Sequence, residues 1–273
     1  MNRPGWNSQR RNRNIGTAKS GYGQNNRMCI PERWADGHLF YERLDNLVAF
    51  SRIVGDHKIT MLVEPVQAGF LHACTPDDIV KVLSLLPSQH VASIDLIVLR
   101  QPKRKQRLLR PVWGRLQYWS EINQYTGVAI HLEAQLINGV QRWHRSLTPD
   151  DAQELERLGQ DGHQIIPERR YYQLYTSLES IRNTQLYRTL PHEVGHHVDY
   201  FESVEKHATE DADEREQLID LYWSKPEKDK EAFAHRYATE FCEREKKAGH
   251  IPFERILNED TLVAEGLEIS WFR

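Results

Sequence analysis

The sequence has few cysteines and no long apolar run. Its three cysteines, Cys29, Cys74 and Cys242, are scattered over 273 residues without a C-x-x-C pair, which argues against a disulfide framework and a cysteine zinc site. The longest apolar stretches, such as residues 94–99, are far shorter than the ~20 residues of a membrane-spanning helix. No apolar block occurs in the first thirty residues, so no secretory signal is expected. We therefore expect a soluble, cytoplasmic protein.

Acidic residues are missing from two basic segments. Residues 1–31 contain six Lys or Arg residues, residues 100–115 contain seven, and neither segment contains Asp or Glu. The net charge of the whole chain is nevertheless only −3. Such segments attract polyanions, so both are candidate contacts for nucleic acid. The alternative is that they are solvated basic surfaces without a partner.

Composition and periodicity divide the chain into three parts. Residues 1–37 are almost free of aliphatic side chains and are predicted to form a disordered basic tail, because they cannot bury enough apolar surface to offset the entropy of ordering. Residues 38–90 are predicted to form an N-terminal helical region packed on the main body, which comprises residues 91–273. The helical prediction follows from apolar residues at helical spacing: Phe40, Leu44, Leu47, Val48 and Ile53.

Two helix starts share the same local sequence. Thr75 and Thr148 are each followed by Pro and two Asp residues, an arrangement that provides an N-cap, a suitable first turn and acids at the positive helix end. Helices are predicted from these positions to about residues 86 and 158. Residues 91–99 and 127–133 are predicted to form strands, the first buried and the second half-exposed. Since the chain after residue 170 has a helical pattern, we predict an α+β fold.

The most specific motif is His192-Glu193-Val194-Gly195-His196. On a helix, His192 and His196 project from nearly the same face one turn apart, where two imidazoles can bind one metal ion. Glu193 lies beside them and can reach a water on the metal without binding the metal itself. From the composition, the expected number of chance matches to H-[DE]-x-x-H is about 0.09. The alternative is a surface helix with two solvated histidines.

A catalytic zinc site needs a third protein ligand and one position open to water. No further His follows His196 at the spacing that some families use. A second helix is predicted to start near Ser224-Lys225-Pro226-Glu227, and an apolar stripe indicates that it is packed inside. Glu231 lies at the entry to this stripe, and a buried carboxylate needs a partner. Glu231 is therefore the predicted third ligand, with Glu227 and Glu240 as alternatives.

These two motifs resemble those of the gluzincin metallopeptidases. The likeness covers about residues 178–245 and is closest in texture to the catalytic domain of anthrax lethal factor and its relatives; repressor-cleaving metallopeptidases share a similar motif pair. It implies that residues 91–273 form a zincin-like metallopeptidase domain with a small sheet and two active-site helices. It also implies one Zn²⁺ ion held by His192, His196 and Glu231, with Glu193 as the base. His235 stands where the thermolysin-like enzymes have Asp.

Several neighbours of the motif are candidates for supporting roles. Asp199 lies one turn after His196 and is placed to accept a hydrogen bond from a ligand imidazole, or else lies on the helix surface. Gly195 suggests that space is needed beside the metal, since Gly costs a helix about 1 kcal/mol relative to Ala. His197 points away and is expected to be structural. A phenol or imidazole is needed to stabilise the oxyanion, and the candidates are Tyr237, Tyr222 and His235.

Two further segments have alternative interpretations. The strand that contains Ile130, His131 and Leu132 is a candidate docking edge for an extended peptide substrate, or else an interior strand. Trp113, Tyr118 and Trp119 lie among basic residues and are expected in the core, although the same mixture suits single-stranded nucleic acid. In the tail, Cys29 offers a thiolate that could hold a metal centre latent.

The sequence thus favours a zinc-dependent endopeptidase that acts on a protein or peptide. A second hypothesis is a nucleic-acid-associated regulator, in which the metal site is structural or belongs to a gated repressor-cleaving protease. A third is a binding module with a structural metal. No membrane partner is expected.

Overall fold

The structure is a computed structural model that describes residues 42–103, 112–208 and 211–273. The predicted tail over residues 1–37 and residues 104–111 of the second basic segment lie outside these ranges. Leu44–Arg273 form one compact unit. Within the described ranges, no helix is long and apolar enough to cross a bilayer.

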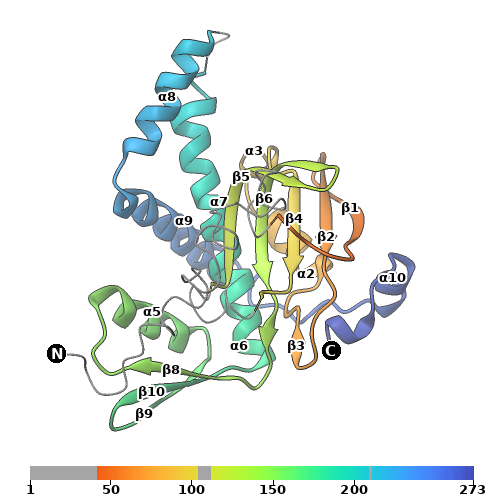
Figure 1. Cartoon of the computed structure of the whole chain (residues 1–273), viewed down its shortest axis with the longest axis vertical. Coiled ribbons are helices and arrows are strands. Elements are labelled where there is room, and N and C mark those ends of the chain that lie inside the picture. The colour runs from red at the N-terminus through yellow and green to blue at the C-terminus, as the bar shows by residue number, and fades with distance from the viewer. Residues whose placement is uncertain (1–41, 104–111, 209–210) are drawn as a thin grey trace, which may run out of the picture. The chain divides into compact units, whose positions relative to one another are not determined.

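A mixed five-stranded sheet forms the centre of an α+β fold (Figure 1). The strand order is β1-β2-β4-β6-β5, in which the three central strands are parallel and the two outer strands are antiparallel to their neighbours. Every residue of β4 is buried, as expected for the middle strand of a sheet. The strands are β1 Val48–Val54, β2 His57–Val63, β4 Leu96–Arg100, β5 Gly114–Ile122 and β6 Tyr125–Glu133.

The prediction of a helical region over residues 38–90 is wrong in the part that forms β1 and β2. Burial alternates along β1 from residue to residue, which is the period of a strand. Gly55, with a φ of 61°, allows the tight turn between the two strands. Ile53 lies on the exposed face of β1, opposite Val48, so the apolar spacing that predicted a helix does not follow the face of the strand. Pairing of β1 with β2 decides the structure of this segment. Because β2 pairs with β4, the predicted boundary at residue 90 separates strands of one sheet.

Both predicted capped helices are confirmed, as α2 Pro76–Ser84 and α5 Pro149–Gln160. In each, the Thr side chain accepts from the backbone of the Asp three residues later, and that Asp accepts in return from the Thr backbone. The strand predicted over residues 91–99 is shorter, because the short helix α3 Ser88–Val91 comes first. The strand predicted over 127–133 is confirmed as β6, but its residues 129–133 are buried, which corrects the expectation of a half-exposed strand.

One continuous helical segment carries the His192–His196 motif. It consists of α6 Leu178–Asn183, the π-helical η2 Thr184–Thr189, α7 Leu190–Tyr200 and the π-helical η3 Phe201–Glu205. The wide turn before α7 has a local cause in Pro191, which has no N–H to donate and whose ring would clash with the carbonyl four residues earlier. The Leu190 N–H accordingly donates to the Gln185 carbonyl, five residues back. Such π turns often mark functional sites.

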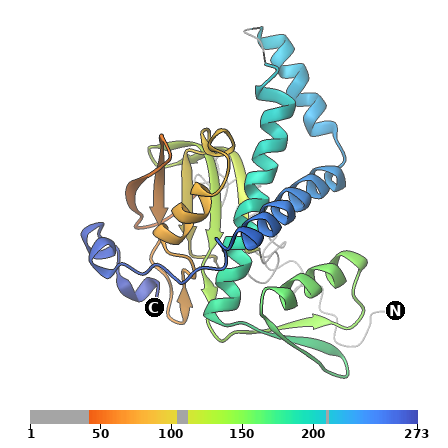
Figure 2. The same ribbon diagram turned by 180° about the vertical axis from the view of Figure 1, so that it is seen from behind.

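The remaining helices follow this segment. They are α8 Ala212–Ser224, α9 Glu227–Ala248, α10 Glu259–Ala264 and the short 3₁₀ turn η4 Ile269–Trp271. In the view from behind, the blue helix α9 crosses α7 on the same side of the sheet as the orange α2 (Figure 2). The predicted helical pattern after residue 170 holds from Leu178 onward. Two smaller sheets precede Leu178. The first has three strands in the order β8 Val140–His144, β10 Tyr171–Tyr175 and β9 Gln164–Pro167. The second pairs β3 Phe70–Leu71 with β7 Gln135–Leu136.

The main core lies between the sheet and the helices α2, η2, α7 and α9. It buries alternate residues of β2, β4 and β6 together with the inner faces of these helices, including Ile59, Met61, Ile97, Ile130, Ile79, Leu186, Val194 and Phe241. A smaller cluster lies on the opposite face of the sheet around Leu62, Val98 and Ala129. The first helix of the metal motif is thus part of the core, which fixes the direction of its side chains.

His72 gives a test of this core through the pH dependence of stability. Its Nε2–H donates to the Glu64 carbonyl at 2.8 Å, and burial lowers its pKa to about 4. An unfolded histidine titrates near 6.5, so the unfolded state binds the extra proton between these two values. The contribution of neutral His72 to the free energy of unfolding is fully present above pH 6.5. It decreases as pH falls toward 4, by up to ~1.4 kcal/mol per pH unit.

We expect His72→Asn to flatten the pH dependence of unfolding over this range, measured by urea denaturation at pH 7, 6 and 5. The variant will be less stable at neutral pH, but its loss on acidification will be smaller. His207→Asn, a change at an exposed histidine, is the control and should retain the wild-type slope. Parallel curves for wild type and His72→Asn would contradict the assignment.

Candidate metal centre

Helices α7 and α9 lie close together at Gly195. A Cβ atom added there would lie 3.0 Å from Ala234 Cα, 3.1 Å from Tyr237 Cβ and 3.2 Å from the Ala234 carbonyl oxygen. These contacts are closer than ordinary van der Waals distances, and two of them involve backbone atoms. The space that Gly195 provides is therefore occupied by α9, which corrects the expectation that it is needed beside the metal. Through this contact the two motifs meet.

The three predicted ligands converge. His196 Nε2 lies 3.1 Å from His192 Nε2, and the two oxygens of Glu231 lie 3.4 Å from His192 Nε2 and from His196 Nε2 respectively. The Glu231 side chain is 42% exposed, so its position does not result from burial, as the sequence suggested. Its carboxylate is instead held at the open side of the two imidazoles.

His235 joins this cluster one turn after Glu231 on α9. Its Nε2 lies 3.9 Å from Glu231 Oε2, and its ring centroid lies 4.5 Å from that of His192. Ligand atoms from His192, Glu231 and His235 all lie within 4.8 Å of one another, which makes these residues a candidate metal site. His196 lies beside this group, with its Nε2 3.1 Å from His192 Nε2 and 3.4 Å from Glu231 Oε1.

The spacing of these atoms fits a small tetrahedral ion. In a zinc centre with bonds near 2.0 Å, neighbouring ligand atoms are about 3.3 Å apart. The distance between the two Nε2 atoms is 3.1 Å, and each Nε2 lies 3.4 Å from a different oxygen of Glu231, whereas His235 Nε2 lies 3.9 Å from Glu231 Oε2. Two imidazoles and one carboxylate are also donors that zinc accepts. The donor set therefore suits the metal that the motif predicts.

Charge in the cluster favours an anionic Glu231. Hydrogen bonds from His192 and His196 hold the pKa of its carboxyl well below the usual range. Burial alone would lower the pKa of His196, but the hydrogen bond to Glu231 and the nearby Glu193 carboxylate outweigh it and raise that pKa above its ordinary value. The surroundings therefore favour positive charge beside these two carboxylates, which a divalent cation would also supply.

Glu193 is buried near the two imidazoles. Burial raises its pKa, although His192 and His196 act in the other direction. The backbone N–H of Leu116 in β5 donates a hydrogen bond to its carboxylate. A buried carboxylate with a raised pKa can both accept and return a proton near neutral pH. This is the property expected of a general base that later acts as an acid.

Of the three oxyanion candidates, only His235 lies in the cluster as described. The Tyr237 hydroxyl is 2.7 Å from His90 Nδ1 of α3, and burial raises the pKa of Tyr237 to about 12. Tyr222 is buried, with its hydroxyl 3.2 Å from that of Tyr118. Both phenols thus have partners within the fold. Burial lowers the pKa of His235 to about 4, assisted by His192 and Arg157, so this imidazole is neutral near pH 7.

Asp199 and His197 have partners outside the cluster. Asp199 accepts a hydrogen bond from Tyr222 and lies 3.5 Å from the Lys225 ammonium. The role predicted for Asp199, orienting a ligand imidazole, stays a prediction. His197 Nε2 lies 2.8 Å from the Ser93 hydroxyl, and burial lowers its pKa to about 4. The structural role expected of His197 is confirmed.

The proposed docking strand is corrected by the sheet order. β6 is paired on both sides: Ile130 opposes Ile97 of β4 and Leu116 of β5. His131 is completely buried, with Nε2 3.2 Å from Gln117 Oε1. Ile130, His131 and Leu132 therefore cannot accept an added strand. In the sheet formed by the described residues, β5 is the outer strand beside α7, and it is β5 that reaches Glu193.

The segment from residue 112 to 119 is only partly a core segment. Trp119 is 58% exposed, which overturns its expected core position, whereas Trp113 packs on His163 with ring centroids 5.3 Å apart. Tyr118 donates to the His196 carbonyl at 3.1 Å. At the ends of the second basic segment, Arg100 is buried and both Arg100 and Arg115 pair with Glu133. Arg100 is therefore unavailable to a phosphate.

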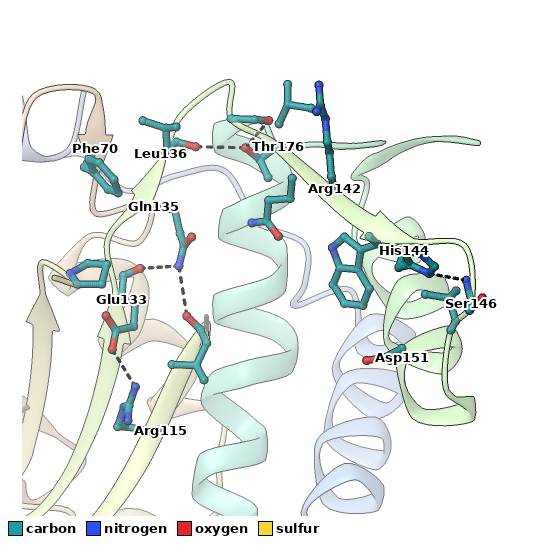
Figure 3. Close-up of a pocket in the computed structure, with 17 residues that line it drawn as sticks. Phe70, Arg115, Glu133, Gln135, Leu136, Arg142, His144, Ser146, Asp151 and Thr176 are labelled. Carbon is teal, nitrogen blue, oxygen red and sulfur yellow. Dashed lines mark hydrogen bonds and ion pairs between the residues drawn. The ribbon is translucent and has the colours of Figure 1, made fainter. Parts of the chain in front are cut away.

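A cavity of about 630 Å³ is lined by residues of the main sheet, the three-stranded sheet and α5. Figure 3 shows Arg115, Glu133 and Gln135 on one side of a helix and His144, Ser146 and Asp151 on the other. The Arg115 guanidinium lies 3.3 Å from Glu133, and the Gln135 amide donates to the Glu133 carbonyl. Arg115 immediately precedes Leu116, so the lining of the cavity and the partner of Glu193 are neighbours on β5.

Two contacts of the centre have no signal in the sequence. Arg157 Nη1 lies 3.2 Å from His235 Nε2. Arg157 belongs to α5, and the strands β9 and β10 lie between α5 and the helical segment of the motif. The Leu116 N–H is a backbone donor, and no side-chain pattern marks it. Both contacts depend on how separate elements pack.

Comparison with known protein families, curated proteins and solved structures finds no match for this chain.

We expect Gly195→Ala to weaken metal binding. The new methyl group has no space against the Ala234 backbone, and overpacking of this kind costs about 1–3 kcal/mol. Because separation of α7 and α9 relieves the strain, Glu231 moves from the imidazoles and the zinc dissociation constant should rise about tenfold or more. Competition with a chromophoric chelator measures it. Ala232→Ser, at an exposed site on α9, is the control; equal affinities for Gly195→Ala and wild type would contradict the prediction.

Proposed function

We propose that the chain is a zinc-dependent endopeptidase of the gluzincin type. The observation that carries the proposal is the convergence of His192, His196 and Glu231 at the spacing of tetrahedral ligand atoms, from two helices distant in sequence. The buried Glu193 beside them supports it, because a structural site has no need of a carboxylate that does not bind the metal.

Bound zinc supplies a Lewis acid that polarises a carbonyl group and lowers the pKa of water toward ~7. The residues of the chain perform the other tasks. Glu193 takes a proton from the attacking water and passes it to the leaving amine, for which its raised pKa is suited. His235 lies in the cluster, but its Nε2 accepts a hydrogen bond from Arg157, so the positive charge of the Arg157 guanidinium beside it is proposed to stabilise the oxygen of the scissile carbonyl. The Leu116 N–H holds the carboxylate of Glu193 in place.

The substrate is proposed to bind in an extended form along β5. This outer strand has a backbone edge toward α7, and an extended peptide can add to such an edge by backbone hydrogen bonds. The cavity beginning at Arg115 is then a site for substrate side chains. This arrangement transfers the docking role from β6 to β5.

A structural metal site is the second candidate function. It is favoured by one observation, the presence of His235 within reach of the same centre. Four protein ligands make a closed site without a position for water, which is typical of structural zinc. A role in nucleic-acid binding depends on residues 1–31 and 100–115, of which residues 1–31 and 104–111 lie outside the described part of the chain.

We expect purified protein to contain about one zinc ion per chain, and Glu193→Gln to retain it. The substitution removes the base but no ligand, so proteolysis of a denatured protein substrate should fall at least about 100-fold. Metal content is measured by mass spectrometry and cleavage by fluorescence. A Glu193→Gln protein with wild-type cleavage would exclude the assigned base, and zinc-loaded wild type without cleavage of any substrate tested would favour the structural site.

Glu231→Ala should instead lose the metal. Removal of one ligand of three leaves only two imidazoles, so the zinc dissociation constant should rise by a factor of about 100 or more. Glu240→Ala provides the matched control, because Glu240 is exposed on the same helix and was the alternative ligand in the sequence. Retention of zinc by Glu231→Ala together with its loss from Glu240→Ala would reverse the assignment.

A further inference from the structure

The cluster contains one imidazole more than a catalytic zinc centre needs. His192, His196 and Glu231 supply three ligand atoms, and His235 Nε2 lies only 3.9 Å from Glu231 Oε2. Since neighbouring ligands of zinc are about 3.3 Å apart, a shift of His235 toward the other ligands would bring it into the fourth position. That shift would displace water and close the site. Something must therefore hold His235 back if the centre is catalytic.

Arg157 donates a hydrogen bond to Nε2 of His235, the nitrogen that faces the cluster. Its Nη1 lies 3.2 Å from His235 Nε2. A guanidinium can only donate hydrogen bonds, so Nε2 must be the acceptor nitrogen of His235, and its single lone pair points to Arg157. The same lone pair cannot bind a metal ion at the same time. The hydrogen bond and coordination by His235 therefore exclude each other.

The position of Arg157 is fixed from both sides. Within α5, its guanidinium contacts Glu154 Oε2 at 3.5 Å and Gln153 Oε1 at 3.3 Å. The helix itself is tied to η2 by Arg188, which lies 2.9 Å from Glu154 and 2.7 Å from Asp161. The segment η2 leads directly into the His192 motif. Arg157 is thus positioned relative to the cluster by ion pairs to the same helical segment that carries two ligands.

We propose that Arg157 keeps His235 out of the metal coordination and thereby preserves the open position for water. Arg157 is a positioning residue in this role, acting through His235. The inference rests on the proposed zinc site and adds the element that distinguishes a catalytic centre from a closed one. When substrate enters, the Arg157 guanidinium also provides a cation close to the carbonyl oxygen, beside the His235 ring.

The test is the number of imidazoles bound to zinc in the full-length protein, measured by X-ray absorption at the zinc edge. Wild type should show two imidazoles, and Arg157→Ala should show three because His235 is released. The zinc dissociation constant of Arg157→Ala should fall about tenfold or more, while cleavage is reduced. Arg157→Lys retains a donor and should restore two imidazoles. Glu156→Ala, at an exposed site on the same helix, is the control and should match wild type.

A second pair of variants separates release of His235 from damage to α5. The double variant Arg157→Ala with His235→Ala should return to two imidazoles, and His235→Ala alone should retain the zinc affinity of wild type. Three imidazoles in wild type, or two in a folded Arg157→Ala protein with unchanged affinity, would overturn the inference. In the second case wild type still binds zinc and cleaves, so the proposed function survives. A wild-type chain that binds no zinc overturns both.

Discussion

The close packing of α7 on α9 is the constraint on which the candidate centre depends. The contact at Gly195 and Ala234 leaves no room for a side chain, so the two helices are held at backbone distance. At that separation, side chains within one turn of the contact can share a single ion. His192 and His196 belong to one helix and Glu231 to the other, and their ligand atoms meet because the backbones do. A wider separation would remove the third ligand.

The orientation of α7 is determined by its own sequence as well as by the core. Pro191 prevents a regular hydrogen bond at the start of the helix, and the preceding π-helical turn absorbs this defect. The residues of η2 and α7 that face the sheet, such as Leu186 and Val194, are fully buried. Since the helix cannot rotate without exposing them, His192 and His196 are directed away from the sheet toward α9. The metal-binding face is thus the complement of the core face.

The charged groups around the centre each have a different partner. Glu231 is paired with the two imidazoles, Glu193 is buried next to them with a backbone donor, and Arg157 faces the additional imidazole. Each carboxylate therefore has its own environment, and their pKa values are moved in opposite directions. In the proposed metallopeptidase, this difference would let Glu231 bind the metal while Glu193 transfers protons.

The sequence alone determined the structural features that depend on residues close together in the chain. The capped starts of α2 and α5, the His192–His196 pair on one helical face and the glycine between them can all be read from neighbouring residues. Glu231 was also found, although for burial that the structure does not show. Only the tertiary structure decided that residues 48–63 are strands, that β6 is interior, and that Arg157 faces His235. The physical reason is that helix caps and helix faces depend on contacts within a few residues. Strand pairing and contacts between helices depend instead on which distant surfaces the core brings together.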